Sequence, residues 1–206
     1  MLLKWIRCTV ADRPAFDRGQ RDWAGLRELP GFLGQRGGWA TDGTANILAL
    51  WSDVASYQRF MAAEHDELAA GQAGTIARTD VRLFQRRLPI GQLPAGNGHI
   101  GGALRLAHCM VRANRIEHFI GVQSTVWNPG MNSTEGFVGG VFAQREELEF
   151  LVATQWASVA DHVRYQAVRF PALRDRAQPT LDLERITGYV VDLDPGWSVD
   201  GLPATP

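Results

Sequence analysis

The side chain with the clearest chemical potential in this sequence is His65. Its spacing from Tyr57 and Met61 puts all three on one stripe of an expected helix, the stripe that faces the sheet. An unperturbed histidine has a pKa of about 6.5, so it can act as a general acid or base near neutral pH. We therefore predict His65 as a catalytic residue. The alternative is a core histidine whose ring is satisfied by a backbone carbonyl, Glu64 or Asp66.

Two cations, Lys4 and Arg7, lie in the first expected strand, residues 2–10. They fall on opposite faces of a strand expected at the sheet centre, where an unpaired charge is costly. Arg7 can hold a carboxylate or stabilise an oxyanion, and we predict it as the second catalytic residue. Lys4 can serve as a point charge or as a desolvated nucleophile, and we predict that it binds substrate. For both, the alternative is pairing with a surface carboxylate beyond the strand end.

Four further residues are predicted to contact the substrate: Trp5, Gln35, Trp39 and Tyr57. Trp5 and Trp39 have no aromatic counterpart in the second half of the chain, which favours them as an aromatic wall. Gln35 and Tyr57 would add hydrogen bonds. Packing in the core is the alternative for all four.

The composition argues against several classes of partner. The formal net charge is −1 with no run of like charges, so no nucleic-acid partner is expected. No apolar stretch approaches the length of a membrane span, and the first residues lack the core of a signal peptide, so we expect a cytoplasmic protein without a membrane partner. The five histidines are scattered, and the two cysteines occupy matching strand positions, so no metal site is expected. A small-molecule ligand is the expected partner.

The two halves of the chain repeat each other. Trp51 and Trp156 are 105 positions apart, as are Phe84 and Tyr189. The second half is diverged, and it supplies a different set of polar and aromatic side chains, namely His108, Gln123, His162 and Tyr165.

In each half the strand and helix signals follow the order βαββαβ, which is the ferredoxin-like unit. We predict an α+β fold of two tandem ferredoxin-like units whose sheets pack into one α+β barrel. The expected division is a first unit at 1–87, a linker at 88–103, a second unit at 104–193 and a C-terminal tail at 194–206. A tandem chain can form the barrel alone, so a monomer is expected, with pairing of edge strands into a homodimer as the alternative.

Three stretches of the first half, residues 4–8 (KWIRC), 31–39 (GFLGQRGGW) and 65–67 (HDE), resemble the YdbC-like family of unknown function. The resemblance covers residues 3–84. It places the chain in the dimeric α+β barrel superfamily, which includes antibiotic-biosynthesis-type and haem-degrading monooxygenases. The resemblance implies the fold and a pocket between helices and sheet, but no particular reaction.

The leading hypothesis is a protein that binds an aromatic or enolisable molecule in a pocket of the first half. If it is an enzyme, we expect a cofactor-independent monooxygenase or isomerase in which Arg7 holds the developing anion and His65 moves the proton. One alternative is a haem-binding or haem-degrading protein with His65 or His162 as the iron ligand. The other is a non-catalytic ligand-binding or scaffold protein.

Overall fold

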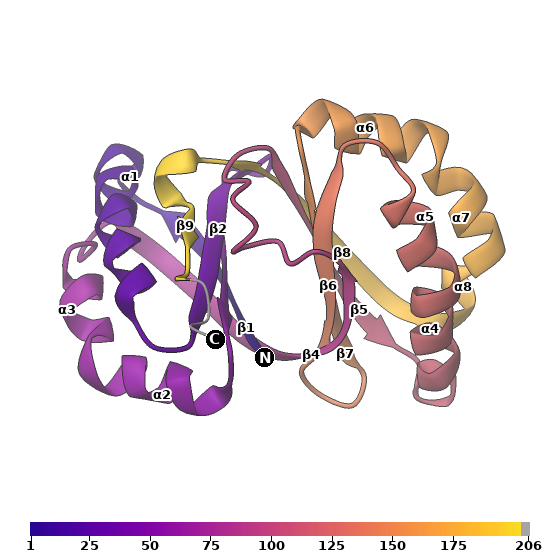
Figure 1. Ribbon diagram of the computed structural model, residues 1–206, viewed down its shortest axis with the longest axis horizontal. Coiled ribbons are helices and arrows are strands. Elements are labelled where there is room, and N and C mark those ends of the chain that lie inside the picture. Colours follow the sequence, from indigo (N-terminus) through magenta and orange to yellow (C-terminus); the bar gives the residue numbers. More distant parts are fainter. Residues whose placement is uncertain (203–206) are drawn as a thin grey trace. The chain divides into compact units, whose positions relative to one another are not determined.

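Each half of the chain contributes an antiparallel set of strands, with helices on one face of it (Figure 1). The computed structural model describes residues 1–202, so the last four residues of the expected tail lie outside the described part. Two compact units result. Unit 1 comprises Met1–Leu83, Ala95–Gly101 and the described residues from Val191 onward, and unit 2 comprises Phe84–Pro94 and Gly102–Val190.

Unit 1 has the strand order β4-β1-β3-β2, the ferredoxin-like arrangement with the first strand in the interior of the sheet. The residues 191–193 at the end of β8 pair with β2, and so does the short strand β9. Asp12 and Asp53 cap α1 and α2 by accepting hydrogen bonds from the amides of Ala15 and Ser56. The elements are β1 (Leu2–Val10), α1 (Arg13–Asp22), a 3₁₀ helix (Trp23–Glu28), β2 (Phe32–Ala40), β3 (Ala45–Trp51), α2 (Val54–Ala63), α3 (His65–Ala70), β4 (Ile76–Gly91), a 3₁₀ turn (Pro195–Trp197) and β9 (Val199–Asp200).

Unit 2 repeats this order as β8-β5-β7-β6, and residues 85–91 of β4 extend its sheet beside β6. Ser158 caps α6 through the amide of Asp161. The elements are β5 (Ala103–Val111), a 3₁₀ turn (Ala113–Arg115), α4 (Ile116–Val122), a π-helical turn (Gln123–Trp127), α5 (Asn128–Asn132), β6 (Phe137–Gln144), β7 (Glu149–Trp156), α6 (Val159–Val168), α7 (Phe170–Ala177), α8 (Pro179–Asp182) and β8 (Leu183–Leu193). The predicted α+β fold of ferredoxin-like units is confirmed.

The segment expected as a linker starts in a strand instead. β4 continues to Gly91, and Ile90 within it is fully buried and pairs with Gly140. The β4–β6 pairing has a register shift between Arg86 and Leu88, and proline is tolerated beside such irregularities, so the strand continues through Pro89. Residues 95–101 belong to unit 1 rather than to a free connection.

Aromatic side chains form the core between helices and sheet in both units. In unit 1 the ring of Trp51 stacks on Phe60 with centroids 5.0 Å apart. In unit 2 the rings of Phe142 and Phe150 stack at 5.3 Å, and Phe119 meets both edge-on. Such pairs add about 0.5–1.5 kcal/mol each beyond the burial of their area, so they fix how the helices lie on the sheet.

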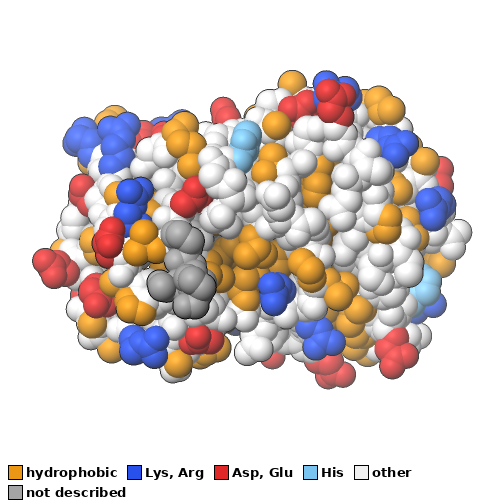
Figure 2. Space-filling view, viewed as in Figure 1, with side chains coloured by type: hydrophobic (Ala, Val, Ile, Leu, Met, Phe, Trp, Pro, Cys, Tyr) orange, Lys and Arg blue, Asp and Glu red, His pale blue; other side chains and the backbone are white. Residues whose placement is uncertain are grey.

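The visible surface carries charges of both signs. On the face shown in Figure 2, basic and acidic side chains are interspersed within each part of the surface. Within residues 1–202, no helix is long and apolar enough to cross a membrane.

Candidate functional site

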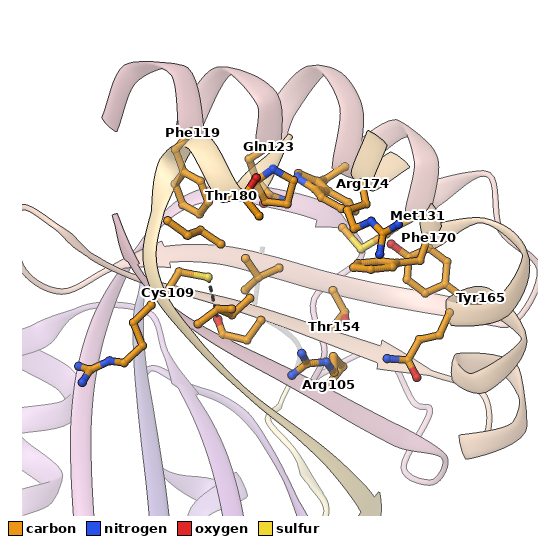
Figure 3. A pocket seen from close by; sticks show the side chains of 18 of the residues that line it. Arg105, Cys109, Phe119, Gln123, Met131, Thr154, Tyr165, Phe170, Arg174 and Thr180 are labelled. Atoms are coloured by element: carbon orange, nitrogen blue, oxygen red, sulfur yellow. Dashed lines mark hydrogen bonds between the residues drawn. The ribbon is translucent and has the colours of Figure 1, made fainter. Parts of the chain in front are cut away.

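A cavity of about 590 Å³ lies in unit 2, between the sheet and the helices (Figure 3). Because side chains alternate along a strand, Arg105, Ala107 and Cys109 of β5 all face it. Most of its wall is apolar. It is lined by Arg105, Ala107, Cys109, Arg112, Phe119, Gln123, Trp127, Met131, Val152, Thr154, His162, Tyr165, Gln166, Phe170, Arg174, Pro179, Thr180, Leu183, Glu184, Arg185 and Ile186.

Arg105 brings a positive charge to the floor of this cavity (Figure 3). Its guanidinium donates to the backbone carbonyls of Leu106 and Tyr189, and no carboxylate pairs with it in the part of the chain that the structure describes. Gly188 makes room for it, since a Cβ at that position would collide with the guanidinium. Desolvation lowers the pKa of Arg105, but an arginine stays charged at neutral pH.

His162 on α6 is the buried imidazole of the same cavity. Its side chain is 1% exposed, and its Nδ1 has no hydrogen-bond partner in the structure. The ring lies edge-on to Trp156 with centroids 5.6 Å apart. Burial, and to a lesser degree the charge of Arg105, lowers the pKa of His162 to about 4. The imidazole is therefore neutral at pH 7, and with the cavity empty it is a weaker base than an ordinary histidine.

Two other ionisable side chains of the wall stay protonated near neutral pH. Burial raises the pKa of the Cys109 thiol to about 12 and moves the pKa of the Tyr165 phenol above its ordinary value. Cys109 is thus a small apolar wall residue rather than a nucleophile. The cavity offers His162 as its neutral imidazole and Arg105 as its partly buried cation.

The mouth of the cavity is positively charged. The exposed side chains of Arg112, Arg174 and Arg185 line it together with one carboxylate, that of Glu184. Arg174 also pairs with Asp175 at 3.5 Å, so three arginines against two carboxylates leave a small excess of positive charge, which favours the approach of an anion.

A π-helical turn shapes the helical wall. It places Gln123 and Trp127 on the cavity, and the buried amide of Gln123 donates to Asn128 Oδ1 at 2.7 Å. Pro129 follows at the start of α5. Single π-helical turns inside helices are often found at functional sites, since they displace side chains toward a ligand.

Unit 1 has a smaller cavity of about 260 Å³ in the corresponding place, lined by Lys4, Gln35 and His65 among mostly apolar residues. Lys4 is 5% exposed, and burial lowers its pKa to about 8. His65 Nδ1 lies 2.9 Å from the carboxylate of Asp66, and its ring meets Trp23 edge-on. Gln35 donates to the carbonyl of Trp197.

Family comparisons bear on unit 1. Residues 2–84 match the model of a domain of unknown function, DUF4937. The uncharacterised protein YdbC of Bacillus subtilis is 32% identical over 97 residues, which is 43% of this chain and 82% of YdbC. The chain belongs to the YdbC family. The matched residues contain the smaller cavity, and the larger one lies in the half that the family model does not cover.

Solved structures with the same fold cover both units of this YdbC-family chain. A candidate monooxygenase from Lactobacillus acidophilus has a TM-score of 0.74 at 12% identity, covering 97% of this chain and 95% of its own. A candidate monooxygenase from Fusobacterium nucleatum has a TM-score of 0.75 at 9% identity, with 93% and 91% covered. A heme-degrading enzyme from Listeria monocytogenes has a TM-score of 0.51 at 10% identity, with 91% and 97% covered. These structures have the fold of the antibiotic-biosynthesis-monooxygenase-like superfamily, and at such identities the likeness concerns the fold alone.

The structure brings together three of the seven residues predicted to form a site in the first half, Lys4, Gln35 and His65. The other four do not line that cavity. Trp5 and Arg7 lie on the opposite face of β1, where they contact Asn46 and Asp42 at 3.0 Å.

Trp39 and Tyr57 are the remaining two. Trp39 donates to Asp17 and packs on Trp197, with ring centroids 5.3 Å apart. Tyr57 packs on Trp51 beside the cavity wall, and its pKa is raised by burial. Both therefore have packing partners within unit 1.

In the second half, Gln123, His162 and Tyr165 line the unit 2 cavity. His108 does not line this cavity. Its Nε2 lies 2.8 Å from Glu149 Oε1, and neither residue is part of the cavity wall. Sequence reasoning missed Arg105. The signal was available, since Arg105 occupies the position of Lys4 when the two first strands are aligned. Among residues 1–202, no group of three histidine, cysteine, aspartate or glutamate side chains is placed to hold a metal ion.

The buried imidazole predicts a pH dependence of stability. Between pH 6.5 and pH 4 the unfolded chain binds a proton at His162 that the folded chain does not bind. Stability should therefore fall by about 3 kcal/mol as the pH drops through this window. Urea unfolding at a series of pH values measures how the free energy of unfolding changes with pH. The variant His162→Phe should lack the decrease of about 3 kcal/mol that His162 contributes. If the free energy of unfolding changes equally with pH in the two proteins, His162 takes up its proton as readily in the folded chain as in the unfolded chain.

Proposed function

We propose that unit 2 binds a small aromatic molecule carrying an acidic oxygen or an enolisable carbonyl, and moves a proton on it. The observation that carries this proposal is Arg105, a cation without a carboxylate partner on the floor of an apolar cavity. A carboxylate, phenolate or enolate of the ligand would supply the missing negative charge. Arginine suits this task because its parallel N–H donors match such oxygens.

Proton transfer is assigned to His162. The imidazole is neutral, and an anionic ligand that neutralises Arg105 would remove one of the two causes that lower its basicity, so it could then take a proton from an acidic C–H or O–H group of the ligand. The electron pair stays on the ligand as an enolate or phenolate, which the positive charge of Arg105 stabilises. Return of the proton at another carbon completes an isomerisation. With dioxygen as co-reactant, the carbanion forms a C–O bond and the resulting peroxide takes the proton, which completes an oxygenation.

The two catalytic roles were predicted from sequence for Arg7 and His65 of the first half. The proposed site gives the same roles to a residue pair of the second half. The fold shared with candidate monooxygenases supports this reaction class, without specifying a substrate.

Ligand charge should decide binding. We expect 2-naphthoate to bind the wild-type protein more tightly than the neutral 2-naphthamide, because only the acid supplies a carboxylate for Arg105. The change Arg105→Met should weaken 2-naphthoate binding at least about tenfold, or about 1.4 kcal/mol, and leave the amide nearly unaffected. Isothermal titration calorimetry measures both.

Arg185→Met is the matched control, because it removes an exposed arginine from the mouth of the same cavity. It should change binding of 2-naphthoate by no more than about threefold. Equal affinities for the acid and the amide, or an unchanged affinity in Arg105→Met, would contradict the proposed anion site.

Proton transfer can be followed on an enolisable aromatic ketone. In D₂O the wild-type protein should accelerate exchange of the C1 protons of 2-tetralone. His162→Phe should slow that exchange by about a hundredfold, since general base catalysis contributes factors of this order. Proton NMR measures the exchange, and His65→Phe is the control. Exchange that depends on His65 instead would move the chemistry to unit 1.

Haem is a second candidate ligand, favoured by the unpartnered Nδ1 of His162. The residues fit the group. A neutral imidazole nitrogen can bind iron, and the arginines at the cavity mouth can hold propionate carboxylates. Bound haem would supply oxidative chemistry, while His162 would hold the iron and the apolar wall would exclude water.

Haemin titration separates this candidate from the first. A haem site at His162 predicts a shifted Soret band that saturates at one haem per chain, disappears in His162→Phe and persists in His65→Phe. A spectrum identical to that of free haemin, or a shift unaffected by His162→Phe, would exclude His162 as the iron ligand.

A further inference from the structure

The cavity of unit 1 contains a buried amine that the proposed function does not use. Lys4 is the one lysine among the 21 basic residues of the chain. It lies on β1 opposite Ala49, and 95% of its surface is buried. Its side chain lines the 260 Å³ cavity, and none of the other lining residues is an aspartate or a glutamate.

The Lys4 amine is surrounded by a thioether and aromatic rings. Nζ lies 3.7 Å from the sulfur of Met61, and it lies 5.3 Å and 5.8 Å from the ring centroids of Tyr57 and Phe60. Within the described residues no carboxylate pairs with it. When the ammonium is buried here, it loses its hydrogen bonds to water and gains only weak cation–π and thioether contacts.

This geometry has a chemical consequence. A lysine taken out of water without a counter-charge loses its proton readily, and burial lowers the pKa of Lys4 to about 8. The neutral amine is a nucleophile, and an apolar cavity beside it can hold the carbon that it attacks. A purely structural lysine would be expected to find a carboxylate or to reach solvent, and Lys4 does neither.

We propose that the unit 1 cavity is a covalent capture site for small aldehydes or ketones, with Lys4 as the nucleophile. The lone pair of Nζ forms a bond to the carbonyl carbon while the C=O π bond breaks, and a proton moves from nitrogen to oxygen. The hydroxyl then takes a second proton and leaves as water, and a C=N bond forms. His65, on the wall of the same cavity, is the ionisable group able to give that proton.

Reductive trapping tests the proposal directly. The full chain is incubated at pH 8 with benzaldehyde and sodium cyanoborohydride, which reduces the imine, and the rate of modification at Lys4 is measured by peptide mass mapping. At this pH about half of the folded chains would have a neutral Lys4, compared with roughly 0.3% for an ordinary lysine. We expect Lys4 to be modified at least about tenfold faster in the folded chain than in the same chain unfolded in urea.

The chain provides its own controls. The α-amino group at residue 1 should react at similar rates in the folded and unfolded chain. Lys4→Arg keeps a cation but cannot form an imine, so its labelling should be confined to the α-amine. Modification of Lys4 that is slower in the folded chain than in the unfolded one would overturn the proposal and leave Lys4 as a buried structural cation. Arg105→Met should be labelled like the wild-type protein, so this test is independent of the site in unit 2.

Discussion

A cation without a carboxylate partner among the described residues, on the first strand of each unit, is the constraint on which both cavities depend; Lys4 is buried and Arg105 is partly buried. The lowered pKa of Lys4 corresponds to a cost of about 3 kcal/mol when the ammonium is kept in the fold at neutral pH. That is a large fraction of the net stability of a typical domain, which is about 5–15 kcal/mol. Aromatic cores such as the stack of Trp51 on Phe60 offset it. A group this costly is explained most simply by a ligand that meets it.

The two units share one strand order and have diverged in what surrounds the cation. Where unit 1 has Tyr57, unit 2 has His162, and where unit 1 has His65, unit 2 has Phe170. The imidazole has thus changed helix between the units, from the start of α3 to the middle of α6. The unit 2 cavity is also more than twice as large as that of unit 1. Unit 1 therefore has a small cavity with the amine of Lys4, and unit 2 has a larger cavity with the imidazole of His162.

The fold was predictable from sequence because local signals and the internal repeat agree. The strands have recognisable residue patterns, α1, α2 and α6 have side-chain caps, and two copies of the order βαββαβ leave few arrangements open. The site was predictable only in part. Alternation along the first strand puts Lys4 and Arg7 on opposite faces of the sheet. The site predicted from sequence nevertheless combines Trp5 and Arg7 with Lys4 and His65, which face the helices. The structure places Trp5 and Arg7 on the other face of β1, beside Asn46 and Asp42.

The rest depends on quantities that a single sequence does not display. Cavity volume is the small difference between the space beneath the helices and the volume of the side chains that fill it. In unit 2 the π-helical turn before Pro129 alters that space, and no periodicity in the sequence announces it. The orphaned nitrogen of His162 likewise becomes visible only once its neighbours are known.

Native mass spectrometry of the protein purified from its own source, beside the variants Arg105→Met and Lys4→Met, tests the central claim most directly. The account predicts a small organic ligand on the wild-type chain whose mass disappears in the variant of the cavity that holds it. A wild-type chain without bound mass, or a ligand retained by both variants, would contradict the claim that these cations lie in the cavities to meet ligands.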